Sequence, residues 1–163
     1  MYLHQEQLNK GFTLIEALVA LVILTIALGP ALLLASNLSA TASIVKNNLI
    51  AANLAQEGVE VVRALRDTNW FTPGASFDSN LADGVYRVEW DSDSLISLGS
   101  NPLLKVNNGL YNYAAGADTV FKRTITLTKV NAAELKVVSD ITWFERGNRA
   151  RDVSVESHLF NWK

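Results

Sequence analysis

The stretch that decides the fold runs from Phe12 to Ala35 and reads FTLIEALVALVILTIALGPALLLA. Its only charged residue is Glu16, and no charge occurs between Ala17 and Val45. About 20 apolar helical residues are enough to cross the hydrocarbon core of a bilayer, which is about 30 Å thick. The alternative is a buried core helix, but a chain this small cannot surround so uniformly apolar a helix with protein. The stretch therefore predicts a membrane-spanning helix.

The composition of the whole chain excludes several classes of protein. The 163 residues carry a net charge of −2 and include no cysteine. This charge argues against binding nucleic acid by neutralising phosphates, so no direct nucleic-acid site is predicted. The lack of cysteine excludes disulfide frameworks, thiolate zinc sites and cysteine nucleophiles. Residues 1–45 contain only three charged side chains, Glu6, Lys10 and Glu16, so an apolar helix is joined to a head of ordinary soluble composition.

The residues before the apolar stretch, MYLHQEQLNKG, do not form an ordinary secretory signal. Such a signal has a basic start, an apolar stretch of about 7–15 residues and a small-residue cleavage site. Here the apolar stretch is longer, and Lys10 is offset by Glu6. The positive-inside rule therefore favours a cytoplasmic N-terminus only weakly.

Two features are unusual for a simple membrane anchor. An ionised Glu16 in hydrocarbon costs several kcal/mol unless it is paired, protonated or close to the lipid headgroups. Gly29-Pro30 removes the hydrogen bond to the carbonyl of Ile26, which predicts a weakened or kinked helix at that point.

The segment Lys10-Gly11-Phe12-Thr13-Leu14-Ile15-Glu16, with the apolar run that follows it, resembles the processing motif of type IV pilins and type II secretion pseudopilins. The resemblance implies that a prepilin peptidase cuts between Gly11 and Phe12 on the cytoplasmic side and methylates the new amine of Phe12. It further implies that the Glu16 carboxylate pairs with the Phe12 ammonium of a neighbouring subunit. Gly29-Pro30 would then mark a segment that loses helicity as the subunit leaves the membrane.

The same resemblance implies partners and a location. The partners are the prepilin peptidase, other pilin or pseudopilin subunits and an assembly platform in the inner membrane. The precursor is expected to span the cytoplasmic membrane once, with its leader in the cytoplasm and its head outside. The mature protein would then enter a cell-surface pilus or a periplasmic pseudopilus.

The helical pattern continues beyond the membrane segment. Apolar residues or glycine recur on one helix face at Ile50, Leu54, Gly58, Val61 and Leu65. Polar residues recur on the opposite face at Gln56, Glu60, Arg63 and Asp67, where Arg63 is within reach of both acids. We therefore predict a leader at 1–11, a long helix at 12–68 with its transmembrane and assembly part at about 12–35, and a head at 69–163. Asp67-Thr68-Asn69 and Thr72-Pro73-Gly74 are the predicted end of the helix.

The head shows the period-two alternation of β-strands. Strands are predicted at Val85–Trp90 and over residues 120–130, 135–144 and 150–160, with short connections at residues 131–133 and 146–148. Residues 72–84 and 91–118 are predicted as loops. The fold class is therefore α+β and pilin-like, with one long N-terminal helix packed on a small antiparallel sheet. The aromatic side chains Trp143, Phe144 and Trp162 are expected to pack the sheet onto the helix.

Few residues of the head suggest chemistry. Asp91 and Asp93, with Asp78 and Asp83 near in sequence, offer oxygen ligands to Ca²⁺, but the EF-hand spacing is absent and solvated aspartates are the favoured interpretation. A triad of His158 with Ser154 or Ser157 and Asp152 can be written, yet these residues are neighbours on one strand. His158 is expected to be a polar residue on the strand face. No cofactor, no metal site and no enzyme are predicted.

Two functions remain open. The favoured one is a structural subunit, a minor pilin or pseudopilin, because the chain lacks the disulfide-bounded loop of many major pilins and ends in strands followed by Asn161-Trp162. The alternative is a single-span membrane-anchored binding protein that does not polymerise, in which Glu16 is dispensable and Gly11-Phe12 is never cut.

Overall fold

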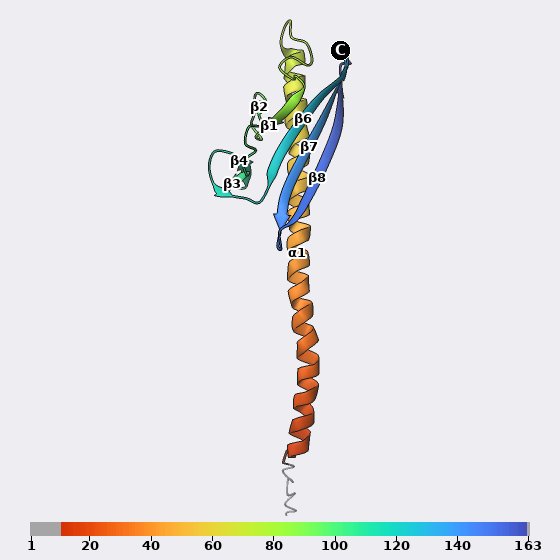
Figure 1. Cartoon of the computed structure of the whole chain (residues 1–163), viewed down its shortest axis with the longest axis vertical. Helices are drawn as coiled ribbons and strands as arrows, with labels where there is room; N and C mark the ends of the chain where they lie inside the picture. The colour runs from red at the N-terminus through yellow and green to blue at the C-terminus, as the bar shows by residue number, and fades with distance from the viewer. Residues whose placement is uncertain (1–10, 163) are drawn as a thin grey trace, which may run out of the picture. The chain divides into compact units, whose positions relative to one another are not determined.

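The computed structural model describes residues 11–162, so the predicted leader lies outside the described residues except for Gly11. The elements follow one another as α1 (Leu14–Phe71), β1 (Gly84–Arg87), β2 (Ile96–Ser97), β3 (Lys105–Asn107), β4 (Leu110–Asn112), β5 (Ala117–Asp118), β6 (Lys122–Asn131), β7 (Glu134–Glu145) and β8 (Arg149–Phe160) (Figure 1). One long N-terminal helix followed by antiparallel sheets confirms the predicted α+β, pilin-like fold class. The chain divides after Ser43 into two units, which are described separately.

The first unit is helical and exposed throughout its described part. Every residue from 11 to 43 is exposed, and α1 continues without interruption across Pro30. Its most apolar window has a mean hydropathy of 2.7, and none of that window is buried. By length and composition, α1 is the one described helix that can cross a membrane.

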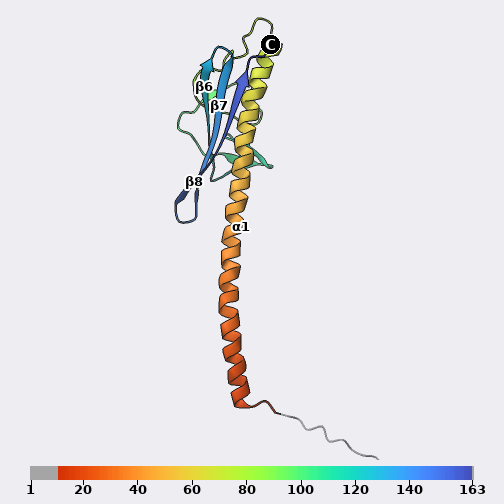
Figure 2. The same cartoon turned by 90° about the vertical axis from the view of Figure 1, so that its right-hand side faces the viewer.

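The second unit contains two antiparallel sheets. The larger has the strand order β2-β1-β6-β7-β8, and β6, β7 and β8 lie side by side along the C-terminal part of α1 (Figure 2). The smaller has the order β4-β3-β5 and is inserted between β2 and β6 in the sequence. Its strands fall within the predicted loop at 91–118. Because they are only two or three residues long, they show no alternation that would have predicted them.

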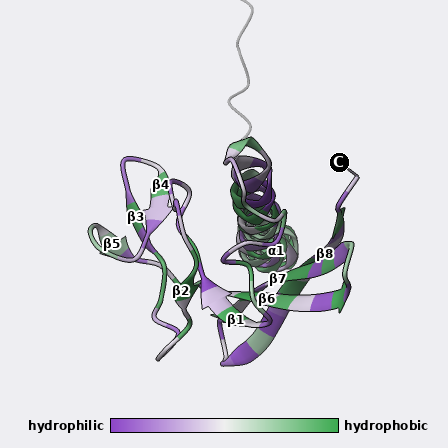
Figure 3. Cartoon of the chain, turned by 90° about the horizontal axis from the view of Figure 1, so that it is seen from above, coloured by the Kyte–Doolittle hydropathy of each residue, from purple (hydrophilic) through white to green (hydrophobic). Residues whose placement is uncertain are grey.

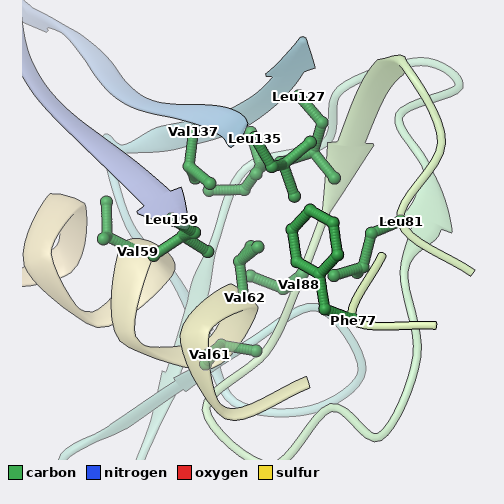
Figure 4. Close-up of a cluster of buried hydrophobic side chains, with 11 residues drawn as sticks. Val59, Val61, Val62, Phe77, Leu81, Val88, Leu127, Leu135, Val137 and Leu159 are labelled. Carbon is green, nitrogen blue, oxygen red and sulfur yellow. The ribbon is translucent and has the colours of Figure 1, made fainter. Parts of the chain in front are cut away.

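The predicted alternation of the long strands is present. The odd-numbered residues from 123 to 127 in β6 and from 135 to 143 in β7 are buried, and their even-numbered neighbours are at least partly exposed. Strand β8 repeats the pattern more weakly. One core cluster joins Val59, Val61 and Val62 of α1 to Phe77, Leu81, Val88, Ile125, Leu127, Leu135, Val137 and Leu159 (Figure 4). A second joins Ala51, Leu54 and Ala55 to Leu104, Phe121, Ile141 and Trp143. Burying such side chains contributes roughly 25 cal/mol per Å² of apolar surface.

The helix approaches the sheet most closely at Gly58. A Cβ atom added there would lie 2.5 Å from Oγ of Ser139 and 2.7 Å from Cδ1 of Ile125. Both distances are too short for real contacts, so only glycine fits without displacing the side chains of Ser139 and Ile125. Gly58 therefore lies on the predicted apolar face because it has no side chain, which leaves room for Ser139 and Ile125.

A buried arginine joins the helix to the sheet beside this contact. Arg123 of β6 is fully buried, and its Nη1 donates to Oε1 of Glu57 at 2.7 Å and to the carbonyl of Leu54 at 3.3 Å. Its Nη2 donates to the carbonyl of Val88 at 2.5 Å. These charge-assisted bonds offset the cost of removing the guanidinium from water.

The ends of two elements differ from the prediction. Helix α1 continues to Phe71 because the hydroxyl of Thr68 donates to its own helix and the amide of Asn69 donates to the carbonyls of Phe77 and Ser79. These polar side chains therefore do not end the helix, which stops before Pro73. Strand β1 ends at Arg87 instead of Trp90. The carbonyl of Val88 is taken by Arg123 and the amide of Glu89 by Oγ of Ser92, so the chain turns.

Three predicted side-chain positions also need correction. Arg63 pairs with Glu60 as expected, but Asp67 pairs with Arg66, which is buried beside it. Among the aromatic residues, Trp143 is buried against Phe121 and the helix as predicted. Phe144 is 61% exposed because it lies on the outer face of β7. Trp162 is 72% exposed, although its ring centroid lies 4.6 Å from that of Trp70.

Replacing Gly58 by alanine tests the close approach of helix and sheet. In an open helix this change stabilises by about 1 kcal/mol. Here we expect a loss of about 1–3 kcal/mol, because the added methyl group displaces Ser139 and Ile125. Thermal unfolding of the head, followed by circular dichroism of the full chain in detergent, measures the effect.

The matched control is Gly29→Ala, where an added Cβ meets nothing within 4 Å, so the head should unfold at the wild-type temperature. Adding Ser139→Ala to Gly58→Ala should recover part of the loss. A Gly58→Ala chain at least as stable as wild type would contradict the close contact.

Candidate processing and assembly segment

The residues predicted for processing lie just outside the start of α1. Gly11 and Phe12 belong to no secondary structure, and the Phe12 side chain is 74% exposed. A peptidase needs an accessible backbone that is not held in a helix. The local structure therefore suits cleavage between these two residues, although cleavage and methylation at Phe12 stay predictions.

Thr13 caps the helix immediately after the predicted cleavage point. Its Oγ1 accepts a hydrogen bond from the backbone amide of Glu16 at 3.3 Å, and its carbonyl accepts from the amides of Glu16 and Ala17, each at 3.1 Å. Thr13-Leu14-Ile15-Glu16 has the spacing of a capping box, a signal that the sequence analysis did not use. A carboxylate in this first turn is also favoured by the positive end of the helix dipole. Glu16 therefore has a local role in starting the helix, separate from any role between subunits.

The Glu16 carboxylate has no partner within its own described chain. The residue is exposed, and between residues 11 and 162 no side chain forms a hydrogen bond or ion pair with it. Its surroundings along the helix are Phe12, Leu14, Ile15 and Leu18, all more than half exposed. When water is removed, an ionised carboxylate among apolar side chains is stabilised by pairing with a cation.

The Gly29-Pro30 pair lies inside α1. The helix remains regular there, and no heavy atom lies within 4 Å of the position of a Gly29 Cβ. Proline nevertheless lacks the amide that would bond to the carbonyl of Ile26. Local weakening at this pair stays a prediction.

The aspartates considered for calcium are not brought together as a set. Asp78 pairs with the Lys129 ammonium, and Asp83 accepts from the backbone amide of Lys129. The hydrogen bonds from Lys129 and then Ser76 lower the pKa of Asp78. Within the described part of the chain, no group of three or more acidic or histidine side chains has the geometry of a metal site.

His158 lies on the exposed face of β8, as predicted, and its ring lies between the carboxylates of Glu134 and Glu156. Its Nδ1 lies 2.7 Å from Oε1 of Glu134 on β7, and its Nε2 lies 3.1 Å from Oε1 of Glu156. The triad that can be written from the sequence does not form, since Ser157 instead accepts from Arg63 at 3.5 Å. Both ring nitrogens face carboxylate oxygens, so only the imidazolium can donate to both.

A comparison with known protein families adds one finding. Residues 7–32 match the family described as the prokaryotic N-terminal methylation motif, which is the signature of type IV pilins and pseudopilins. The match includes Gly11, Phe12 and Glu16 and leaves the head outside it. No curated protein and no solved structure matches the chain.

The chain therefore carries the type IV pilin and pseudopilin signature at the start of its long helix. The motif indicates a pilin-like substrate of a prepilin peptidase and implies assembly with other pilin subunits. Together with the apolar helix it indicates membrane anchoring. Proteins with this motif are structural and not enzymatic.

The contacts of His158 predict a pH-dependent stability of the head. The hydrogen bonds with Glu134 and then Glu156 raise the pKa of His158 above its ordinary value of 6.5. A group whose pKa is raised by folding stabilises the fold at low pH, and this contribution is lost as the pH rises through the folded pKa. Between about pH 6 and pH 8 we therefore expect the melting temperature of the wild-type head to fall more than that of His158→Gln.

Below about pH 5 the wild-type head should also lose stability. Hydrogen bonds from Lys136 and then His158 lower the pKa of Glu156. The stability that the Glu156 carboxylate contributes to the fold is therefore lost as the pH falls through its folded pKa. Parallel pH profiles for wild type and His158→Gln between about pH 6 and pH 8 would show that the acidic pair does not hold the imidazolium in solution.

Proposed function

We propose that this protein is a structural subunit, a minor pilin or pseudopilin, of a type IV pilus or a type II secretion pseudopilus. It is made as a membrane-inserted precursor, cut between Gly11 and Phe12, methylated at Phe12 and packed into a filament through its N-terminal helix. The inner-membrane assembly platform and other pilin or pseudopilin subunits are the partners of this step.

One observation carries the proposal. An apolar helix that is exposed from residue 14 to residue 43 holds a single carboxylate, Glu16, without a partner in its own described chain. A lipid bilayer covers the apolar surface but does not neutralise the charge. A bundle of identical helices covers the same surface and also supplies a cation for each carboxylate.

The charges balance in such a bundle. Cleavage after Gly11 creates one ammonium group at Phe12 for each Glu16 carboxylate. Burying either charge alone costs several kcal/mol, whereas a closely paired set recovers much of that cost. Pairing between neighbouring copies therefore favours a register in which Phe12 of one subunit meets Glu16 of the next.

Features of the head support a minor subunit. The chain has no cysteine, so the disulfide-bounded loop of many major pilins is absent. The strand-rich C-terminus ends in β8 and Asn161-Trp162, and Trp162 lies against Trp70 at the end of α1. Trp162 therefore joins the residues after β8 to the end of α1 through a noncovalent contact.

Mass spectrometry of the N-terminal peptide tests the processing step. In cells that contain the matching peptidase, we expect a peptide that begins at Phe12 and carries one extra methyl group. Cleavage of the bond between residues 11 and 12 should depend on the glycine at position 11. The Gly11→Val variant should therefore retain the full leader. An intact N-terminus at Met1, in cells that process their other prepilins, would favour the single-span anchor that does not polymerise.

Replacing Glu16 by glutamine tests the assembly step. The cap at Thr13 uses the backbone amide of Glu16, so the variant keeps the cap and loses only the charge. We expect normal membrane insertion and cleavage but at least a tenfold loss of subunit in sheared or pelleted filaments. The control is Glu60→Gln, which removes an exposed carboxylate of the same helix. Unchanged assembly of Glu16→Gln would refute charge pairing while leaving cleavage as a separate result.

A further inference from the structure

Strand β8 leaves one side of its backbone without a strand partner. The larger sheet has the order β2-β1-β6-β7-β8, so β8 forms an edge along its 12 residues. Viewed from above, β2 and β8 lie on opposite sides of the group β1, β6 and β7 (Figure 3). Proteins commonly protect such an edge with a proline, a bulge or a covering segment. Strand β8 contains no proline, and its register with β7 is regular throughout.

One hydrogen bond identifies the residues of β8 that face the free side. The amide of Asn161 donates to the carbonyl of Ala133 at 2.8 Å, just beyond the pair of Glu134 and Phe160. In an antiparallel ladder this makes Glu134 and Phe160 a non-hydrogen-bonded pair. The even-numbered residues of β8 therefore direct their N–H and C=O groups away from β7. In agreement, the carbonyl of Phe160 accepts a hydrogen bond from Nη1 of Arg66 at 3.0 Å.

The open edge, defined here as residues 150–158, matches the backbone of an added peptide strand. Its even-numbered residues are all exposed, namely Ala150, Asp152, Ser154, Glu156 and His158. Nine extended residues are about 30 Å long, which is enough to pair with a peptide of about eight residues. An extended peptide satisfies the outward N–H and C=O groups as a further strand of the sheet would.

The outer face beside the open edge favours positive charge in such a peptide. Asp152 of β8 and Asp140 of β7 both lie on this face, and Asp140 is directly opposite Ser154. Among the described residues, neither aspartate forms an ion pair. Glu156, in contrast, already pairs with Lys136 at 2.7 Å. A basic side chain placed beside Ser154 therefore comes close to two unpaired carboxylates.

The inner side of the open edge favours small apolar side chains. A groove between α1 and β8 is lined there by Val59 and Val155, together with Arg63 and Ser157. The charge of Arg63 is already balanced, because its guanidinium pairs with Glu60 and also donates to Oγ of Ser157 at 3.5 Å. Side chains of an added strand point alternately to the outer face and to this groove. A strand that alternates basic and small apolar residues therefore fits both sides.

We propose that the open edge of β8 binds an extended peptide segment of a different protein, in which basic and small apolar residues alternate. The backbone of the peptide pairs with β8. Its basic side chains lie over Asp140 and Asp152, and its apolar side chains enter the groove beside Val155. This peptide-binding site goes beyond the structural role proposed above and does not depend on assembly through the N-terminal helix.

A second copy of β8 matches the open edge less well than such a peptide. Antiparallel pairing of two β8 strands about Ser154, the middle of the open edge, places Asp152 of each copy opposite Glu156 of the other. Like charges in directly opposite positions destabilise a strand pair. The occupant is therefore a strand of opposite charge.

Binding of a synthetic peptide to the full chain in detergent tests the proposal. The probe is a fluorescein-labelled peptide of eight alternating lysine and valine residues, and fluorescence anisotropy measures its affinity. We expect binding at least tenfold tighter than that of the same peptide with glutamate in place of lysine. Only one of the two alternating sets of peptide amides can donate to β8. Methylating the backbone nitrogens of that set should weaken binding at least tenfold, and methylating the other set should change it less than twofold.

Two matched pairs of variants locate the site on the chain. Ser154→Pro removes an N–H that faces the open side and no hydrogen bond to β7, so it should weaken binding at least tenfold, whereas Ser154→Ala should bind as the wild type does. Asp140→Lys with Asp152→Lys should also weaken binding at least tenfold. Asp91→Lys with Asp93→Lys makes the same change of charge in the exposed turn before β2 and should change the affinity less than twofold. Circular dichroism checks that each head is folded, and the aspartate variants decide the question if Ser154→Pro does not fold.

The absence of saturable binding overturns the proposal. Equal effects of methylating the two sets of nitrogens also overturn it, because charge alone would then hold the peptide. Unchanged affinity of the Asp140→Lys and Asp152→Lys double variant would place the peptide elsewhere on the chain. A wild-type dimer that sediments as such without peptide, and that Ser154→Pro dissociates, would assign the open edge to a second copy instead.

Discussion

The head depends on how closely its helix can approach the sheet. At Gly58 no side chain intervenes, and Ser139 and Ile125 occupy the space that a Cβ would need. This closeness brings the fully buried guanidinium of Arg123 within reach of Glu57 and of carbonyls on the helix and beside β1. Three N–H groups of this guanidinium are bonded in this way, and these bonds hold the helix and the strands in one relative position.

Much of the fold could be predicted because burial follows simple periods. The helix face from Ile50 to Leu65 and the alternation in β6, β7 and β8 are regular enough to read from residue types. Arg123 illustrates the limit. Its position is inward by alternation, but a charged residue is expected in solvent unless its partners are known. Those partners come from two distant segments, the helix and the residues after β1. The short strands β2 to β5 fail for another reason, since two or three residues cannot establish a period.

The candidate site divides in a similar way. The motif around Gly11, Phe12 and Glu16 is local in sequence, so residue order alone predicts it, and the capping-box spacing of Thr13 and Glu16 was equally available. The predicted partner of the Glu16 carboxylate lies in another molecule, and between residues 11 and 162 no side chain pairs with this carboxylate. Lys129, remote in sequence, contacts both Asp78 and Asp83, and residue order alone does not predict these contacts.

The apolar helix and the head differ in what they gain from association. The helix exposes apolar side chains that water does not tolerate, together with one charge that lipid does not tolerate. In the proposed filament, neighbouring helices with cationic ends would remove both penalties at once. The head is well packed and soluble in composition, so it gains little from burial of apolar surface. In the proposed filament the helix therefore supplies most of the free energy of association.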